Sequence, residues 1–271
     1  MKIWDIDGLL PYIKIGSAVV IPTYFLVISI GFCISILFLI QRARKLGLDR
    51  TLALDSSIVV MVSGFVGARI FHVLYEAPLY YAEDMFRVFE IWRGGFVWYG
   101  GAIGGFLGFY FFSRIKKMSL GLWLDGYAPV CALGYMIGRI SCFLTGCCFG
   151  GVCYLTPTIA FQHPTQLYAV IWEGLLLTAL LVLEKKMWHR RSSLESGDSC
   201  LLWRPGALFA VWILGHGAGR LMMEYFRADE RGPELFGLSI SSWISLFTSL
   251  AALVWVALPK AQTALQSRQN K

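Results

Sequence analysis

Charged side chains are scarce in this chain of 271 residues, where Asp, Glu, Lys and Arg together make up 15% of the sequence. Soluble domains carry about 25% charged residues. Apolar residues reach 57%, and the mean hydropathy is +0.62. This balance disfavours a soluble α/β domain and favours a protein whose solvent is lipid.

Other features are missing as well. The sequence has no low-complexity tract, no stretch polar enough for a soluble domain, and no clear internal repeat, which disfavours a transporter built from inverted repeats. The segment before the first apolar run contains Asp5 and Asp7 instead of a basic cluster, and no small-residue cleavage site follows that run. We therefore expect a retained anchor instead of a cleaved signal peptide, within one integral-membrane domain over residues 1–271.

Seven apolar runs approach the ~20 residues that a helix needs to cross a bilayer. Their ranges are 18–40, 57–75, 94–112, 122–146, 166–183, 205–226 and 238–258. The sequence thus predicts an all-α, polytopic membrane protein with about seven transmembrane helices.

Basic residues gather after alternate runs, as they do on the cytoplasmic side of membrane proteins. The basic segments contain Arg42, Arg44, Lys45 and Arg50; Arg114, Lys116 and Lys117; Lys185, Lys186, Arg190 and Arg191; and Lys260, Arg268 and Lys271. This alternation places the N-terminus outside and the C-terminus in the cytoplasm. The net charge of +7 then needs no nucleic acid partner and suits anionic lipid head groups.

Ionisable residues inside membrane spans are costly, so each one is a functional hypothesis. Arg220 and Glu224 are four residues apart and share a helix face, with Arg227 close to it. One interpretation is an internal ion pair that neutralises itself. The other is an anion site in which Glu224 positions an arginine, whose planar fork suits a phosphodiester.

The third run is rich in glycine between Gly94 and Gly105. Glycine at this density weakens a helix and lets two backbones approach closely. The pattern therefore indicates either tight helix packing or a broken segment that exposes main-chain groups to a ligand.

Five motifs occur in order along the spans, and together they carry a resemblance. They are Gly67–Arg69, Tyr99–Gly104, Gly138–Arg139, His163–Tyr168 (His-Pro-Thr-Gln-Leu-Tyr) and Arg220–Arg227. With these motifs, residues 18 to 258 resemble the bacterial prolipoprotein diacylglyceryl transferases.

The resemblance implies a seven-span enzyme of the bacterial inner membrane that needs no metal or soluble cofactor. Such an enzyme moves the diacylglyceryl group of phosphatidylglycerol to the lipobox cysteine thiol in a prolipoprotein signal peptide, and glycerol phosphate leaves. The implied catalytic residues are Arg139, Arg220, Tyr99, Glu224 and His163. The implied substrate-binding residues are Arg69, Gly100, Gly101, Gln166, Tyr168 and Arg227.

Proton transfer has no single obvious carrier in this sequence. Tyr99 has an ordinary pKa near 10, so we expect it to orient the lipid phosphate. His163 is better suited as a base, although its place before Pro164 also fits a helix start. His216, one turn from Arg220, is compatible with a neutral imidazole or with core packing.

The chain departs from the family pattern at several positions. Tyr99 stands where many members have histidine, Cys142 and Cys147 replace asparagine and glutamate, and Ala169 replaces another glutamate. These changes leave open a divergent paralogue with another acceptor, or a non-catalytic protein on the same fold that binds lipid or lipoprotein.

Four of the seven cysteines gather at the predicted outer face: Cys142, Cys147, Cys148 and Cys153. An oxidising compartment permits disulfides, and buried cysteine also packs as a small apolar residue. Metal binding and thiol chemistry are further alternatives, although the cluster lacks a paired CxxC spacing.

Overall fold

The computed structural model describes residues 10–15, 19–91, 94–156, 159–193, 205–227 and 235–257. This part of the chain is mostly helical, which confirms the predicted all-α class. In chain order the elements are β1 (Tyr12–Ile15), β2 (Val19–Pro22), α1 (Thr23–Lys45), α2 (Arg50–Phe71), η1 (His72–Glu76), α3 (Pro78–Glu83), η2 (Met85–Phe89), α4 (Trp98–Ile115), α5 (Leu120–Thr145), β3 (Val152–Thr156), β4 (Ile159–Gln162), α6 (Thr165–Ser193), α7 (Ala207–Phe226) and α8 (Ile240–Ala257).

Each of the seven predicted runs coincides with one long helix of the described chain: α1, α2, α4, α5, α6, α7 or α8. Four helical stretches are long and apolar enough to cross a membrane: Thr23–Lys45, Arg50–Glu76, Leu120–Thr145 and Thr165–Met187. The protein is therefore a helical membrane protein with four candidate spans, and a membrane crossing by α4, α7 and α8 stays a prediction.

Two predicted helix starts are wrong. Residues 19–22 belong to β2, which pairs with β1 in antiparallel register from Tyr12↔Pro22 to Ile15↔Val19. The β-branched residues Val19, Val20 and Ile21 suit a strand, so α1 begins only at Thr23. In the third run, Gly94 and Gly95 have φ of 79° and 82°, conformations that α-helices exclude.

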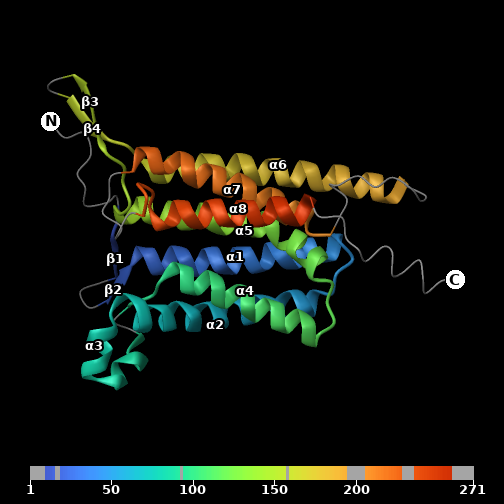
Figure 1. The fold of residues 1–271 in the computed structure, drawn as a ribbon, viewed down its shortest axis with the longest axis horizontal. Helices are drawn as coiled ribbons and strands as arrows, with labels where there is room; N and C mark the ends of the chain where they lie inside the picture. Colours follow the sequence, from blue (N-terminus) through green and yellow to red (C-terminus); the bar gives the residue numbers. More distant parts are fainter. Residues whose placement is uncertain are drawn as a thin grey trace. The chain divides into compact units, whose positions relative to one another are not determined.

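Two compact units divide the chain, one formed by Met1–Ser35 with Leu124–Lys271 and the other by Ile36–Trp123. In the second unit, α2 runs alongside α4 (Figure 1). A Cβ atom on Gly67 would lie 2.3 Å from the carbonyl oxygen of Gly100, and one on Gly104 would lie 2.4 Å from that of Ser63. Within α4 these glycines face another backbone, as the packing interpretation predicts, whereas exposure of main-chain groups to a ligand stays a prediction.

In the first unit, α7 packs between α6 and α8 (Figure 1). Its core contains Ala128 and Ala132 of α5, Leu180 of α6 and Leu208 of α7. Asp125 caps the start of α7, where its carboxylate accepts hydrogen bonds from the main-chain N–H groups of Gly206 at 2.8 Å and Phe209 at 3.1 Å. A polar residue within α5 thus satisfies donors that the first turn of a helix leaves unpaired.

Large apolar side chains cover the outside of both units. Examples are Phe25 at 58% exposure, Phe65 at 59% and Leu175 at 65%. Soluble proteins rarely expose apolar patches of this extent, so these helix surfaces match a lipid environment.

Candidate active site

Arg220 lies on α7 beside a small cavity of the first unit. The cavity is lined by Tyr135, Ala169, Trp172, Glu173, His216, Gly219, Arg220 and Met223. Within the described residues, no hydrogen bond or ion pair joins the Arg220 guanidinium to another side chain or carbonyl group. Its fork of donors is therefore available for a ligand.

A buried carboxylate–imidazole pair lies in the same cavity. Glu173 of α6 is 1% exposed, and one of its oxygens lies 2.5 Å from Nδ1 of His216 on α7. Trp212 stacks on the His216 ring at 5.3 Å. The second carboxylate oxygen, Oε2, has no hydrogen-bond partner among the described residues, so it is available to a donor that enters the cavity.

The sequence analysis did not assign a site role to Glu173 or His216. Two signals could have found the pair. Glu173 is the only charged residue in the run 166–183, and His216 precedes Arg220 by one helical turn. The sequence could not show that α6 and α7 bring them together.

Arg139 reaches the same region from α5. Its guanidinium lies over the ring of Tyr135, 4.8 Å from the centroid. The Tyr135 ring in turn meets the His216 ring edge to face at 4.5 Å, and it lines the cavity beside Arg220. Tyr135 thus connects the two predicted catalytic arginines, because its ring carries Arg139 and it lines the same cavity as Arg220.

The His163–Tyr168 motif forms the start of α6 and the segment before it. The His163 ring nitrogen Nδ1 lies 3.2 Å from the Tyr168 hydroxyl, and both rings pack against Phe226 at the end of α7. The main-chain N–H groups of Gly150 and Gly151 donate to the carbonyl groups of His163 and Phe226. This motif thus ties α6, α7 and the loop after α5 together at one end of the unit.

Glu224 and Arg227 close the same end. The Ser241 hydroxyl of α8 donates to the Glu224 carboxylate at 3.5 Å, and Arg227 forms a main-chain bridge with Gly150. The internal ion pair, one of the two interpretations that the sequence left open for Arg220 and Glu224, is not found among the described residues, and the roles of both residues toward substrate stay predictions. Both side chains project from α7, but Glu224 turns toward α8.

Arg69, Tyr99, Gly100 and Gly101 belong to the second unit and are described by themselves. Arg69 is 8% exposed, and its guanidinium donates to five main-chain carbonyl groups, those of Arg87, Val88, Glu90, Gly94 and Gly95. A guanidinium has five N–H donors, so every one is already engaged. This geometry gives Arg69 a structural task, and substrate binding by it stays a prediction.

The other three predicted residues of this unit lie in the first turn of α4. Tyr99 is half-buried, and its ring meets that of Trp98 at 5.4 Å. Gly100 packs against the backbone of α2, whereas a Cβ atom on Gly101 would make only ordinary contacts at 3.5 Å. Roles for them toward substrate stay predictions.

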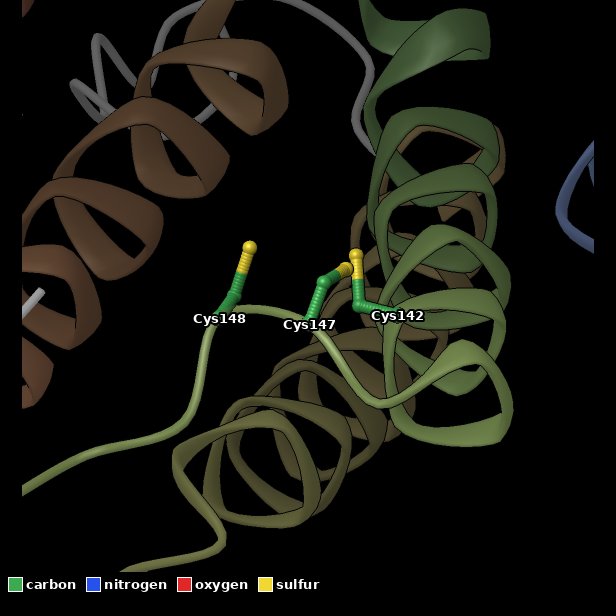
Figure 2. Close-up of side chains that lie close together, drawn as sticks. All are labelled: Cys142, Cys147 and Cys148. Carbon is green, nitrogen blue, oxygen red and sulfur yellow. The ribbon is translucent and has the colours of Figure 1, made fainter. Parts of the chain in front are cut away.

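Three of the four clustered cysteines meet at the end of α5. Ligand atoms of Cys142, Cys147 and Cys148 all lie within 4.8 Å of one another, and Figure 2 shows the three side chains on the same side of the loop. Cys153 lies apart on β3, and the six described cysteines are free thiols.

The Cys148 thiol has an unusual electrostatic environment. Hydrogen bonds from the thiols of Cys142 and Cys147 lower the pKa of the Cys148 thiol, burial opposes that change, and the positive charges of Arg227 and Arg139 act with the hydrogen bonds. Thiolate is the form of cysteine that acts as nucleophile and metal ligand. This environment favours the thiolate form of Cys148.

The fold is that of a helical membrane protein, and Arg220 lines a cavity within it. Comparison with known proteins identifies the family within this class. The family model for prolipoprotein diacylglyceryl transferase matches residues 12–258, and the chain belongs to that family.

Three relatives illustrate the similarity, each named phosphatidylglycerol–prolipoprotein diacylglyceryl transferase. The protein of Clostridium tetani is 30% identical over 241 residues, which cover 85% of this chain and 90% of the relative. That of Bordetella avium is 31% identical over 224 residues, covering 79% and 80%. That of Frankia alni is 30% identical over 245 residues, covering 85% of this chain and 61% of the longer relative. The family and these names identify the chain as a transferase.

Proposed function

We propose that this chain transfers the diacylglyceryl group of phosphatidylglycerol to the lipobox cysteine thiol of prolipoproteins and releases glycerol phosphate. The observation that carries the proposal is that Arg139 lies over the ring of Tyr135, and that Tyr135 lines the same cavity as Arg220. Two permanent positive charges among buried helices suit a phosphodiester, whose charge grows on the leaving phosphate as the carbon–oxygen bond breaks.

Different residues would bind different parts of the two substrates. Arg220 offers its guanidinium fork to the lipid phosphate, and Arg139 adds a second positive charge. The Glu173–His216 pair lines the same cavity as Arg220 and would shape the pocket that receives the head group. The end of the unit around His163, Gln166 and Tyr168 receives the signal peptide.

The membrane arrangement is part of this proposal. Seven spans, with the N-terminus outside and the C-terminus in the cytoplasm of a bacterial inner membrane, agree with seven long helices and with the alternation of basic residues. In this orientation the outer ends of α5 and α7 and the start of α6 lie together, at the side where prolipoproteins emerge.

Purified full-length protein tests the reaction directly. Phosphatidylglycerol in mixed micelles and a lipobox peptide should give a peptide with one thioether-linked diacylglyceryl group and an equal amount of glycerol phosphate. A peptide with serine at the lipobox position is the matched control. Rescue of a strain depleted of its own transferase tests the same activity in cells. No product and no rescue, at normal membrane amount, would instead favour another acceptor or a non-catalytic lipid-binding role.

A further inference from the structure

The three-cysteine loop combines ligand atoms with a preorganised backbone. The hydroxyl of Thr165 donates to the carbonyl oxygen of Cys148 at 2.8 Å, and the side-chain amide of Gln166 donates to that of Cys147 at 2.5 Å. The Cys147 N–H donates to the carbonyl oxygen of Cys142 at 3.1 Å. The carbonyl oxygens of the three cysteines thus each accept a hydrogen bond, and Thr165 and Gln166 are themselves buried.

This anchoring holds Cys148 in a conformation that it would not adopt unaided. Its φ of 64° lies in the left-handed region, which residues other than glycine rarely adopt. The result is that Cys148 turns its side chain to the side of the loop where Cys142 and Cys147 point (Figure 2).

Three thiol ligands at this spacing suit a soft metal ion. Three thiolates around a zinc ion at about 2.3 Å in tetrahedral geometry would lie roughly 3.8 Å apart, and the three ligand atoms here are within 4.8 Å of one another. A disulfide would use two of the thiols at about 2.05 Å and would leave the third without a function. Three thiolates and one zinc ion carry a net charge of −1, which the nearby positive charges of Arg227 and Arg139 offset.

We propose that Cys142, Cys147 and Cys148 bind one zinc ion, and that its open fourth position takes the acceptor thiol of the prolipoprotein. This proposal rests on the proposed function, and it departs from the expectation that no metal is needed. Three protein ligands with one open position are typical of catalytic zinc, whereas structural sites are closed.

The transfer requires that the acceptor thiol lose its proton, and a zinc ion would promote that loss. A coordinated thiol is deprotonated, so the acceptor binds as thiolate and its proton passes to solvent. The thiolate sulfur attacks the glyceryl carbon next to the phosphate, the carbon–sulfur bond forms, and the carbon–oxygen bond to phosphate breaks. The electron pair of that bond leaves with glycerol phosphate, and neither oxidant nor reductant is required.

The position in the chain suits this role. Cys142 follows Arg139 by three residues on α5, so both side chains lie on neighbouring positions of one helix face. The proposed thiol site thus lies one helical turn from an arginine proposed to serve the phosphate, where nucleophile and leaving group must meet.

Metal content of the purified full-length protein provides the first test, with thiols kept reduced. One equivalent of zinc should remain after dialysis of the wild-type protein. The zinc affinity should fall at least tenfold in each of three variants: Cys142→Ser, Cys147→Ser and Cys148→Ser. Cys153→Ser, a change outside the cluster, is the matched control and should keep full zinc. Wild-type protein that binds no zinc with its thiols reduced, or a Cys142–Cys147 disulfide in protein isolated without reductant, would overturn the proposal.

Cobalt substitution in wild-type protein tests the open position without any activity measurement. Co²⁺ should give thiolate charge-transfer and tetrahedral d–d absorption bands, and a lipobox peptide should add a further thiolate band that the serine peptide does not. Bands unchanged by the cysteine peptide would remove the acceptor thiol from the metal.

Transfer activity separates this proposal from the proposed function. Zinc removal should lower turnover more than tenfold, and zinc readdition should restore it. Full turnover in metal-free protein overturns the zinc role and leaves the function standing. A zinc-loaded protein that binds the peptide thiol and transfers nothing overturns the function and leaves the site standing.

Discussion

Replacing Arg220 with lysine tests the anion site most directly. The change keeps one positive charge at the same position and removes the planar fork. Because the Arg220 guanidinium makes no hydrogen bond within the described residues, the substitution breaks no contact of the fold that the structure shows. We therefore expect the membrane amount and the thermal stability to stay near those of the wild type.

The expected loss follows from the bonds that the fork makes to phosphate. A hydrogen bond to a charged group contributes about 1.5–3 kcal/mol, and lysine retains the charge but only one well-directed contact. A net loss of about 2 kcal/mol in the transition state corresponds to roughly 30-fold in kcat/KM, at about 1.36 kcal/mol per tenfold. The measurement is the rate of thioether formation against phosphatidylglycerol concentration in mixed micelles.

Arg69→Lys is the matched comparison, since it makes the same chemical change at an arginine with all five donors engaged. Lysine has three donors, so at least two of these part-buried carbonyl groups would lose their partner, at about 1 kcal/mol each. This variant should lose protein amount and stability before it loses specific activity. A value of kcat/KM within twofold of wild type in Arg220→Lys, at normal protein level, would refute phosphate binding at this position.

Three further changes test other parts of the molecule. Gly104→Ala should lower the unfolding temperature by several degrees, because its Cβ would lie 2.4 Å from a carbonyl oxygen of α2. Gly101→Ala, whose Cβ would lie 3.5 Å from its nearest neighbours, should be tolerated. Equal unfolding temperatures for the two variants would contradict the packing argument. Tyr99→Phe should lower turnover about fivefold, the value of one hydrogen bond of ~1 kcal/mol; an inactive Phe variant beside a fully active His variant would make position 99 the proton acceptor. Reagents that do not cross the membrane should label a cysteine placed at His163 and not one at Lys117, and the reverse pattern would overturn the proposed orientation.

The positions of the long helices were predictable from the sequence because lipid imposes one rule on all of them. Backbone groups in a bilayer must pair within the segment, so an apolar run of sufficient length predicts a helix. The ends were less predictable. The α6 helix continues to Ser193, ten residues past the apolar run that ended at Leu183, because a helix needs no apolar side chains once it leaves the membrane interior.

The two hairpins were not predicted, since each is short and adjoins a longer apolar run. Val19–Pro22 carries the same apolar composition as the helix that follows it. Only its pairing with Tyr12–Ile15 distinguishes it, and pairing between strands is not visible in the composition of one segment. The β3–β4 hairpin is similar, with a register shift between Tyr154 and Thr156.

Within the site, the sequence revealed which residues are costly in a membrane and could not reveal what they touch. Asp125, Glu173 and Arg69 were equally conspicuous as polar groups in apolar runs. The structure gives them three different tasks, as a helix cap, as the partner of His216, and as a clamp on main-chain carbonyl groups. These tasks depend on contacts between residues 18 to 84 positions apart in the chain, from Arg69 with Arg87 to Asp125 with Phe209.

Arg69 and Arg220 show how the partners of a buried charge indicate its role. Both are arginines in apolar helices, and both belong to motifs that carry the family resemblance. A buried guanidinium is tolerated only when its donors find acceptors. Arg69 finds five within the chain, so the folded protein alone satisfies it. Arg220 finds none within the described residues and lines a cavity beside a carboxylate oxygen that is also unpaired there. The described residues leave the Arg220 donors open to a ligand, and we expect a lipid phosphate to supply their acceptors with the charge that a guanidinium binds best.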